Sequence, residues 1–285
     1  MTRTREPGSG ARRTRVGASC ALLSLLASCG EDARVASPST EAVTPTPGPE
    51  ETELLVFAAT SLRDAFRTME TRFEATHPGV DVTLQLAGTQ ELRAQIEAGA
   101  PADVLASADV VSMEALHTAG RVEETTIFAR NEPVLVVSRE ARERVTTFAD
   151  LPRAERIVLG GPEVPIGRYA LTILDNADRA LAPSFRARVE AHVVSREPNV
   201  SQVLAKVAMG EAEAGIVYRT DVRGADPELG VISIPTEISV IAAYPIATVE
   251  GAPHPRLASA WIELVLGTEG RTVLADAGFL AAEAP

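Results

Sequence analysis

After residue 53, apolar and polar positions alternate with two different periods, one typical of strands and one typical of helices. A short apolar run over 54–58 is typical of a buried strand. Over 62–73, apolar residues recur three and four positions apart, which predicts a helix with one buried face. Alternation with a period of two over 80–86 predicts the next strand. We therefore expect strands and helices to follow one another along the chain.

The same succession continues to the C-terminus. Helices are expected to start near residues 89, 109, 168 and 200, and two more are expected around Trp261 and Val273. Apolar runs between them predict further strands, over 103–106, 134–137, 157–160, 215–218, 231–234 and 246–249. Strands that alternate with helices in this way predict an α/β fold with mostly parallel sheets.

The N-terminal segment has a pattern that no globular fold requires. Five arginines lie within the first 15 residues, and an apolar run over 16–27 follows them. This run is shorter than the ~20 residues that a membrane-spanning helix needs. A basic stretch followed by a short apolar stretch is typical of a secretory signal, so we predict a signal peptide over 1–28 and an exported protein.

The end of this apolar run resembles the lipobox of bacterial lipoproteins. Residues 26–29 read LASC, in which Cys29 would be lipidated and become the mature N-terminus. The alternative is ordinary cleavage near Ser28, which would leave Cys29 as a free thiol. Residues 29–52 are rich in Pro, Ser and Thr, and we interpret them as an extended tether between the lipid and the folded part.

Charge and cysteine content narrow the classes of function. The formal charge is −12, and loss of residues 1–28, with five Arg and one Glu, would change it to −16. An acidic chain of this kind is not expected to bind nucleic acid or an anionic membrane surface electrostatically. The two cysteines, Cys20 and Cys29, lie in the signal and at its end, so neither a disulfide nor a cysteine metal site is expected in the folded part.

Four places where a strand or loop is followed by a predicted helix share one feature. Helix starts carry backbone N–H groups without intrahelical partners, and the helix dipole favours negative charge there. Ser61, Thr89, Ile166 and Val200 lie at these starts. Each position alone is more often an ordinary helix cap than a ligand contact, and Tyr218 alone is more often a core residue. Together they would bind an oxyanion with neutral donors.

Several sequence blocks resemble the periplasmic molybdate-binding proteins of ABC importers (the ModA type). The blocks follow the family's order between about residues 53 and 280. They are VFAATSL at 56–62, QIEAGAPADV at 95–104, SAD at 107–109, VPIGRYA at 164–170, GIVY at 215–218, YPIA at 244–247 and GF at 278–279.

This resemblance implies a two-lobed class II periplasmic-binding-protein fold with the ligand cleft between the lobes. It further implies that hydroxyls and backbone amides, without a positive side chain, clamp molybdate or tungstate. Carried over by position, Ser61 and Thr89 would each provide a hydroxyl and an amide, Ile166 and Val200 would provide main-chain N–H groups, and Tyr218 would donate its phenolic O–H. The bound oxyanion would be a ligand, and no cofactor or free metal cation is implied.

The chain departs from the family pattern in two of its loops. Relatives usually carry Ser-Ser or Ser-Gly where this chain has Gly88, Thr89 and Gln90, and they often carry Ala where it has Ile166. A methyl group at Thr89 stiffens its rotamer. These changes bear on which anion fits more than on whether an oxyanion binds. Sulfate or phosphate is therefore the alternative ligand.

An enzyme is a weaker interpretation of the same residues. Hydrolysis by Ser61 would require a neighbouring base. The four histidines, at 77, 117, 192 and 254, lie in no motif with Ser or Asp, and the pattern Gly-x-Ser-x-Gly is absent from the sequence. We expect a monomeric binding protein without catalytic activity.

The resemblance also suggests how the chain is divided and what it works with. We expect residues 53–131 with 240–285 to form lobe one and residues 132–239 to form lobe two, with a hinge at 131–133 and another before Tyr244. The expected partners are an ABC permease and its cytosolic ATPase. The expected location is the periplasm or the outer face of the cell membrane, with contact to the membrane only through the lipid anchor.

Overall fold

The computed structural model describes residues 52–283 of the 285-residue chain. The predicted signal peptide, Cys29 and the tether up to residue 51 lie outside the described residues. Strand β1 begins at Thr52, which the sequence had assigned to the end of the tether. Within the described part of the chain, no helix combines the length and apolar character needed to span a membrane.

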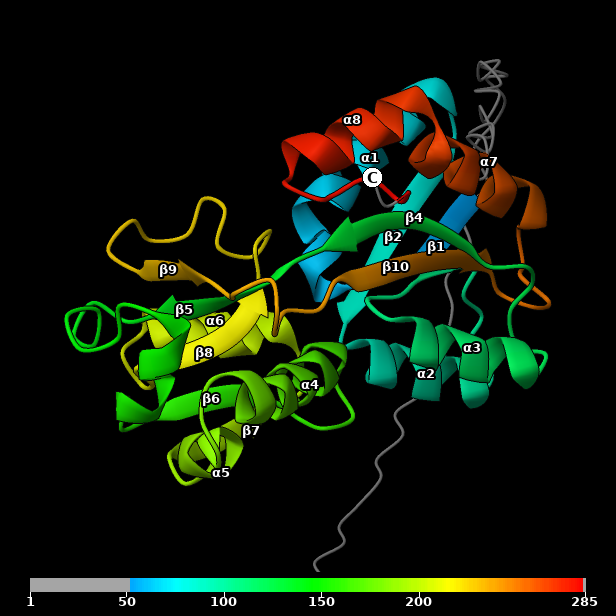
Figure 1. Ribbon diagram of the computed structural model, residues 1–285. Coiled ribbons are helices and arrows are strands. Elements are labelled where there is room, and N and C mark those ends of the chain that lie inside the picture. The colour runs from blue at the N-terminus through cyan, green and yellow to red at the C-terminus, as the bar shows by residue number, and fades with distance from the viewer. Residues whose placement is uncertain (1–51, 284–285) are drawn as a thin grey trace, which may run out of the picture. The chain divides into compact units, whose positions relative to one another are not determined.

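Five strands form a first sheet in the order β2-β1-β3-β10-β4 (Figure 1). Strand β1 runs parallel to β2 and β3, whereas β10 is antiparallel to both of its neighbours. The strands are β1 (Thr52–Ala59), β2 (Val80–Ala87), β3 (Val104–Ala106), β4 (Thr126–Asn131) and β10 (Ala242–Thr248).

A second sheet of five strands has the order β7-β6-β8-β5-β9. Strand β6 is parallel to β7 and β8, and β5 is antiparallel to β8 and β9. The strands are β5 (Pro133–Val137), β6 (Ile157–Gly160), β7 (Val193–Glu197), β8 (Ala214–Tyr218) and β9 (Gly230–Ser233).

The predicted α/β fold is confirmed, but the expectation of mostly parallel sheets is wrong. In the first sheet, β10 is antiparallel to both of its neighbours. In the second sheet, β5 is antiparallel to both of its neighbours. Both strands come directly after the chain has passed from the other sheet. Such a strand does not follow a crossover helix of its own sheet, so nothing forces it to run parallel to its neighbours.

Helices cover both faces of the first sheet. Figure 1 shows α1, α7 and α8 on one side and α2 and α3 on the other. We call this sheet with its helices the first lobe. Its helices are the short 3₁₀ helix η1 (Thr60–Leu62), α1 (Arg63–Thr76), α2 (Thr89–Glu97), α3 (Val110–Thr118), α7 (Pro255–Leu266) and α8 (Thr268–Asp276).

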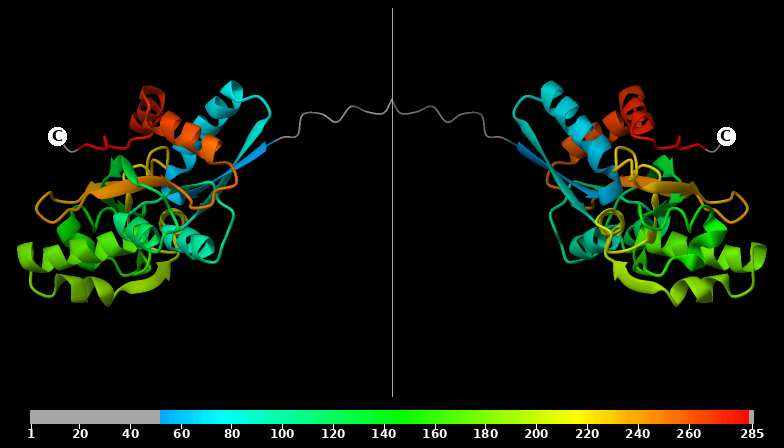
Figure 2. Two further views of the ribbon diagram at one scale, coloured as in Figure 1. Left: turned by 90° about the vertical axis from the view of Figure 1, so that its right-hand side faces the viewer. Right: turned by 90° about the vertical axis from the view of Figure 1, so that its left-hand side faces the viewer.

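The second lobe consists of the second sheet and its helices. Helices α4 and α6 pack against β6 and β8, and α5 packs against α4. Both views of Figure 2 place α7 and α8 of the first lobe, in orange and red, away from these green and yellow elements. The second-lobe helices are the 3₁₀ helix η2 (Phe148–Arg153), α4 (Pro165–Ala180), α5 (Phe185–Glu190) and α6 (Val200–Ala208).

The chain passes between the two sheets twice. Only Glu132 separates β4 from β5, and residues 234–241 connect β9 to β10. The Glu132 carboxylate accepts a hydrogen bond of 2.7 Å from Nε of Arg219, which follows β8 directly. This hydrogen bond fixes the first connection to the residue that follows β8.

The first lobe has an aromatic core around the single tryptophan of the chain. The Trp261 side chain is fully buried, and its ring lies edge-on to Phe66 and Phe73, with centroid distances of 5.6 and 5.5 Å. Its indole N–H has no hydrogen-bond partner among the described residues. The contribution of Trp261 is therefore packing between α1 and α7 rather than hydrogen bonding.

We expect Trp261→Ala to lower the free energy of unfolding by about 3–5 kcal/mol, because it leaves a large cavity between two helices. Trp261→Phe should cost less than half of that, since it keeps an aromatic ring and removes an unpartnered N–H. Urea unfolding followed by circular dichroism measures both values. A loss below about 1 kcal/mol for the alanine variant would contradict a packing role.

Candidate functional site

One cavity brings together all five positions that the sequence selected as oxyanion contacts. It lies where segments of the two lobes meet, and the space between its walls, about 220 Å³, is partly open to solvent. Ser61 and Thr89 reach it from the first lobe, and Ile166, Val200 and Tyr218 reach it from the second. The full lining comprises Ala59, Thr60, Ser61, Ala87, Gly88, Thr89, Ala108, Val164, Pro165, Ile166, Asn199, Val200 and Tyr218.

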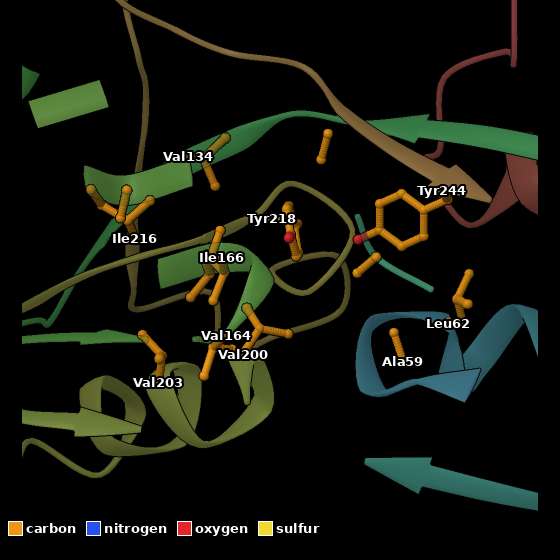
Figure 3. Close-up of a cluster of buried hydrophobic side chains, with 14 of the residues drawn as sticks. Ala59, Leu62, Val134, Val164, Ile166, Val200, Val203, Ile216, Tyr218 and Tyr244 are labelled. Atoms are coloured by element: carbon orange, nitrogen blue, oxygen red, sulfur yellow. The ribbon is translucent and has the colours of Figure 1, made fainter. Parts of the chain in front are cut away.

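Figure 3 shows how the two lobes meet at this point. Val164, Ile166 and Val200 lie on one side, Ala59 and Tyr244 lie on the other, and Tyr218 lies between them. The centroids of those two rings are 5.9 Å apart and the rings are steeply inclined to each other. Apolar side chains therefore form part of the wall around the polar groups.

Ser61 belongs to a chain of hydrogen bonds in the first lobe. Its hydroxyl oxygen lies 2.9 Å from the hydroxyl of Tyr244, and Nδ2 of Asn131 donates to that same tyrosine oxygen at 3.3 Å. Because Tyr244 accepts from Asn131, its own proton can go to Ser61. The Ser61 proton is then available to an acceptor in the cavity.

The spacing of Ser61 and Asp64 in the sequence predicts a capping box, but no such box is formed. The first turn of η1 and the start of α1 show no side-chain cap.

Burial raises the pKa of Tyr244 far above its ordinary value, so this tyrosine stays a neutral donor beside the serine. The serine hydroxyl is thus held by a side chain from β10 and not by its own helix.

Thr89 is the first residue of α2 and is almost completely buried. Its hydroxyl oxygen accepts a hydrogen bond of 3.1 Å from the N–H of Ala108. A hydroxyl that accepts one hydrogen bond still carries a proton to donate. Ala108 therefore fixes the rotamer of Thr89 and leaves its proton free for a ligand.

Close packing of backbone fixes the start of α4. Ile166 follows Pro165 in the first turn, where N–H groups have no intrahelical partner. A Cβ atom on Gly167 would lie 1.9 Å from the carbonyl oxygen of Gly161 and 2.6 Å from that of Gly160. Only glycine fits at 167, so the end of β6 holds the Ile166 amide in place.

The start of α6 has a conventional cap. The Asn199 side chain accepts a hydrogen bond of 3.0 Å from the N–H of Gln202, and Val200 is the first helical residue. Because Asn199 uses its oxygen within the turn, the N–H of Val200 remains directed away from the helix. Ile166 and Val200 thus each present a main-chain donor, and their buried side chains belong to the apolar wall.

Tyr218 ends β8 with its ring 1% exposed. Its hydroxyl has no hydrogen-bond partner among the described residues, although it lines the cavity. Burial raises the pKa of Tyr218 well above its ordinary value, so the group is a neutral O–H donor at any physiological pH. A buried donor without a partner costs free energy, and a ligand acceptor in the cavity would offset this cost.

The electrostatics of the cavity come from dipoles rather than from charges. Among the described residues, those that line it are all uncharged. Asp221, just behind Tyr218, accepts the Tyr218 backbone N–H at 2.9 Å. Desolvation raises the pKa of Asp221 to about 7, which lowers its negative charge near neutral pH. The acidic character of the chain is thus kept away from these donors.

The chemistry of these donors suits a small oxyanion. Neutral hydroxyl and amide donors in a water-excluded cavity stabilise negative charge without a cation. In the part of the chain that the structure describes, no group of three or more His, Cys, Asp or Glu side chains could hold a metal ion. Hydroxyl and amide donors of this kind match the oxygen acceptors of an anion.

Sequence reasoning missed the residues that orient the donors. In the sequence, Tyr244 is only part of the block YPIA at 244–247, and Asn131 is only a predicted hinge position. Their partner Ser61 lies 183 positions before Tyr244, so no local pattern could reveal the hydrogen bond. The only available signal was a buried tyrosine in an otherwise apolar strand.

Comparisons with known proteins show which family this chain resembles. A family model described as bacterial extracellular solute-binding protein matches residues 54–280. The molybdate-binding protein ModA of Mycobacterium tuberculosis H37Rv is 34% identical over 263 residues, which cover 92% of this chain and 95% of the relative. The putative ABC transporter substrate-binding lipoprotein YvgL of Bacillus subtilis is 29% identical over 231 residues, covering 80% and 86%.

Solved structures share the fold. The periplasmic molybdate-binding protein of Azotobacter vinelandii superposes with a TM-score of 0.69 at 18% identity, covering 80% of this chain and 98% of that one. The sulfate-binding protein SubI of Mycobacterium tuberculosis H37Rv has a TM-score of 0.71 at 17% identity, covering 80% and 86%. At these identities the likeness concerns the fold alone, and the fold does not separate the two anions.

Replacement of Gly167 by Ala tests the packing that holds the start of α4. We expect Gly167→Ala to lower the free energy of unfolding by about 2 kcal/mol or more, because backbone atoms must move. Gly230→Ala is the matched control, since its Cβ would make an ordinary 3.5 Å contact, and it should stay within about 0.5 kcal/mol. Equal losses in urea unfolding of both variants would refute this account.

Proposed function

The chain belongs to the family of bacterial extracellular solute-binding proteins, and we propose that it captures molybdate or tungstate for an ABC importer. One observation carries this proposal. Five residues from both lobes, which together carry seven hydroxyl and backbone N–H donors, line one uncharged cavity. The 34% identity to a molybdate-binding protein over nearly the whole chain supports the choice of anion.

Each of the five residues has a proposed role in holding the anion. Ser61 and Thr89 contribute a hydroxyl and a backbone N–H each, and Ile166 and Val200 contribute backbone N–H groups. Tyr218 contributes the hydroxyl that has no partner among the described residues. The anion is the ligand of the protein and not a cofactor, and its metal atom is reached only through the oxygen atoms around it.

The number of donors is sufficient for useful affinity. Hydrogen bonds to a charged group contribute ~1.5–3 kcal/mol each, so about seven contribute ~10–20 kcal/mol before costs. Association costs at least ~4 kcal/mol, and removal of water from a dianion costs more. A net value near −8 to −11 kcal/mol corresponds to dissociation constants from about micromolar to about ten nanomolar.

Size is the property that separates molybdate and tungstate from sulfate. All three are tetrahedral dianions and present the same oxygen acceptors. In a cavity built for the larger anions, sulfate would leave some donors with stretched or unmade hydrogen bonds, and unmade bonds are costly in a dry site. The methyl group of Thr89 and the side chain of Ile166 set how tight this cavity is.

The remaining features follow from this assignment. We propose that residues 53–131 with 240–285 and residues 132–239 move as two lobes about 131–133 and the segment before Tyr244. A permease with a cytosolic ATPase would recognise the closed form. The protein would act as a monomer without catalytic activity.

A lipid anchor would keep the protein near its permease. The relative YvgL is named a lipoprotein, which supports lipidation of Cys29 in this chain. Each buried CH₂ of an acyl chain adds ~0.8 kcal/mol to membrane affinity. We propose that Cys29 carries the acyl chains, that residues 29–52 form the tether, and that the folded part works outside the cytoplasm.

Calorimetric titration of residues 29–285 carrying Cys29→Ser tests the ligand and the donors together. We expect one molybdate or tungstate per protein and far weaker binding of sulfate and phosphate. Ser61→Ala and Tyr218→Phe should each weaken molybdate binding about 10- to 100-fold, since each removes a hydrogen bond to a dianion.

Ser259→Ala is the matched control for Ser61→Ala, because the Ser259 hydroxyl donates within α7 to the Pro255 carbonyl oxygen at 3.0 Å and lies outside the cavity lining. It should bind molybdate as the parent protein does. Binding of sulfate or phosphate without molybdate or tungstate would keep the fold and reject the proposed ligand.

Labelling of cells with radioactive palmitate tests the anchor. We expect the label in the full-length protein and none in a Cys29→Ala variant. A matched Cys20→Ala variant should be labelled normally, because Cys20 precedes most of the apolar run of the signal. Equal labelling of the parent protein and Cys29→Ala would exclude Cys29 as the site.

A further inference from the structure

Two polar contacts between helix starts of the two lobes lie outside the residues that line the cavity. The first joins Gln90, in the first turn of α2, to Pro198, which precedes α6. Nε2 of Gln90 donates to the Pro198 carbonyl oxygen at 2.6 Å. A Cβ atom on Gly88 would lie only 2.3 Å from that oxygen, so a residue with a side chain at 88 would prevent the approach.

The second contact joins Arg168, in the first turn of α4, to α3. Its guanidinium pairs with the carboxylate of Asp109, and Nη2 donates to Oγ of Ser112 at 3.2 Å. The Asp109 side chain is 3% exposed and the Arg168 side chain 30%. Asp109 is also the N-cap of α3, where it accepts the N–H of Ser112 at 2.9 Å. The carboxylate is therefore fixed, and only the arginine has to arrive from the other lobe.

We propose that Gln90 and Arg168 are positioning residues that form a latch, which holds the lobes closed over the anion and sets how fast the anion leaves. This inference rests on the proposed capture of an anion between the lobes. Neither residue lines the cavity, so the latch acts through closure of the lobes and not through contact with the ligand.

The physical reason lies in where the contacts are made. Hydrogen bonds and ion pairs between lobes exist only while the lobes are closed, so they favour the closed state over the open one. Opening must break them before the anion can dissociate, and this slows release. Association begins from the open state, in which the contacts are not yet made, so its rate should change little.

The two contacts should differ in strength. Loss of Gln90 removes one hydrogen bond between neutral groups, which corresponds to about 5-fold faster release. Loss of Arg168 leaves a nearly buried carboxylate without its cation, and this costs more than the pair itself contributes. We therefore expect about 10- to 30-fold faster release for Arg168→Met.

The test measures lobe distance and anion release in the same protein. The mature chain 29–285 with Cys29→Ser retains no native cysteine, because the chain has only two. Spin labels are attached through Thr118→Cys in the first lobe and Met209→Cys in the second, both at exposed positions. Pulsed electron double resonance then gives the distance distribution between lobes, and a chase with unlabelled molybdate gives the release rate of radiolabelled molybdate.

We expect Gln90→Ala and Arg168→Met to shift the anion-free distribution to longer distances and to release molybdate faster, with unchanged association rates. The ratio of molybdate to tungstate affinity should stay the same, which a change in the cavity itself would not allow. Gln95→Ala on α2 and Arg153→Met, whose ion pair with Asp150 lies within the second lobe, are the matched controls.

Asp109→Asn provides a check that does not depend on the folding of the arginine variant. Asparagine is as good an N-cap as aspartate, so α3 should keep its start while the interlobe ion pair is lost. Combination with Arg168→Met should release molybdate no faster than Arg168→Met alone, because no unpaired carboxylate remains.

The latch is overturned if neither the anion-free distances nor the release rates differ between the parent protein and these variants. Failure of the parent protein to close on or bind molybdate would instead reject the proposed function. The anion-free distances still decide on the latch in that case, because they do not depend on which anion binds.

Discussion

Backbone N–H groups in the first turn of a helix have no partner within the helix, and this constraint organises the centre of the molecule. One cavity is lined by residues at the starts of α2, α4 and α6 and by residues of the short helix η1 before α1. If apolar residues alone closed over them, several donors would be buried without acceptors. A dianion can accept hydrogen bonds from many donors at once. Its binding would therefore offset the free-energy cost of burying these N–H groups without acceptors.

The absence of charge from the lining is consistent with this design. A cation in the cavity would attract the anion more strongly, but it would also be costly to bury in the anion-free protein. Neutral donors avoid that cost and keep their orientation through neighbours. The Ala108 amide fixes Thr89, the Tyr244 hydroxyl orients Ser61, and the backbone of β6 holds the start of α4. Thr89, Ser61 and the start of α4 are thus each held by a neighbouring group.

A binding protein for an importer must hold its ligand and also release it. Contacts with the anion raise affinity in a way that depends on the anion, whereas contacts between the lobes change the lifetime of the closed state for any anion. The two kinds of contact are spatially separate in this structure: uncharged residues line the cavity, and the Arg168–Asp109 pair and the Gln90–Pro198 hydrogen bond lie outside it. This separation would allow the lifetime of the closed state to change without a change in selectivity.

The amino-acid sequence by itself determined the elements of this protein and the positions of its donors. The succession of apolar runs and helical stripes is a local property, and so is a helix start, which is why the positions of Thr89, Ile166 and Val200 could be recognised without coordinates. Main-chain donors do not depend on side-chain identity, so the departures from the family pattern did not hide them. Local reasoning failed where a side chain had two possible partners, as in the expected capping box of Ser61.

The tertiary structure alone decided how the donors are oriented and how the lobes are held together. The partners of Ser61 and Gln90 lie 183 and 108 positions away along the chain. It also decided strand direction, because β5 and β10 each enter their sheet from the other lobe. Such contacts have no period and no local signal in the sequence. They arise only when folding brings distant segments together, and their geometry is set by the packing of both lobes.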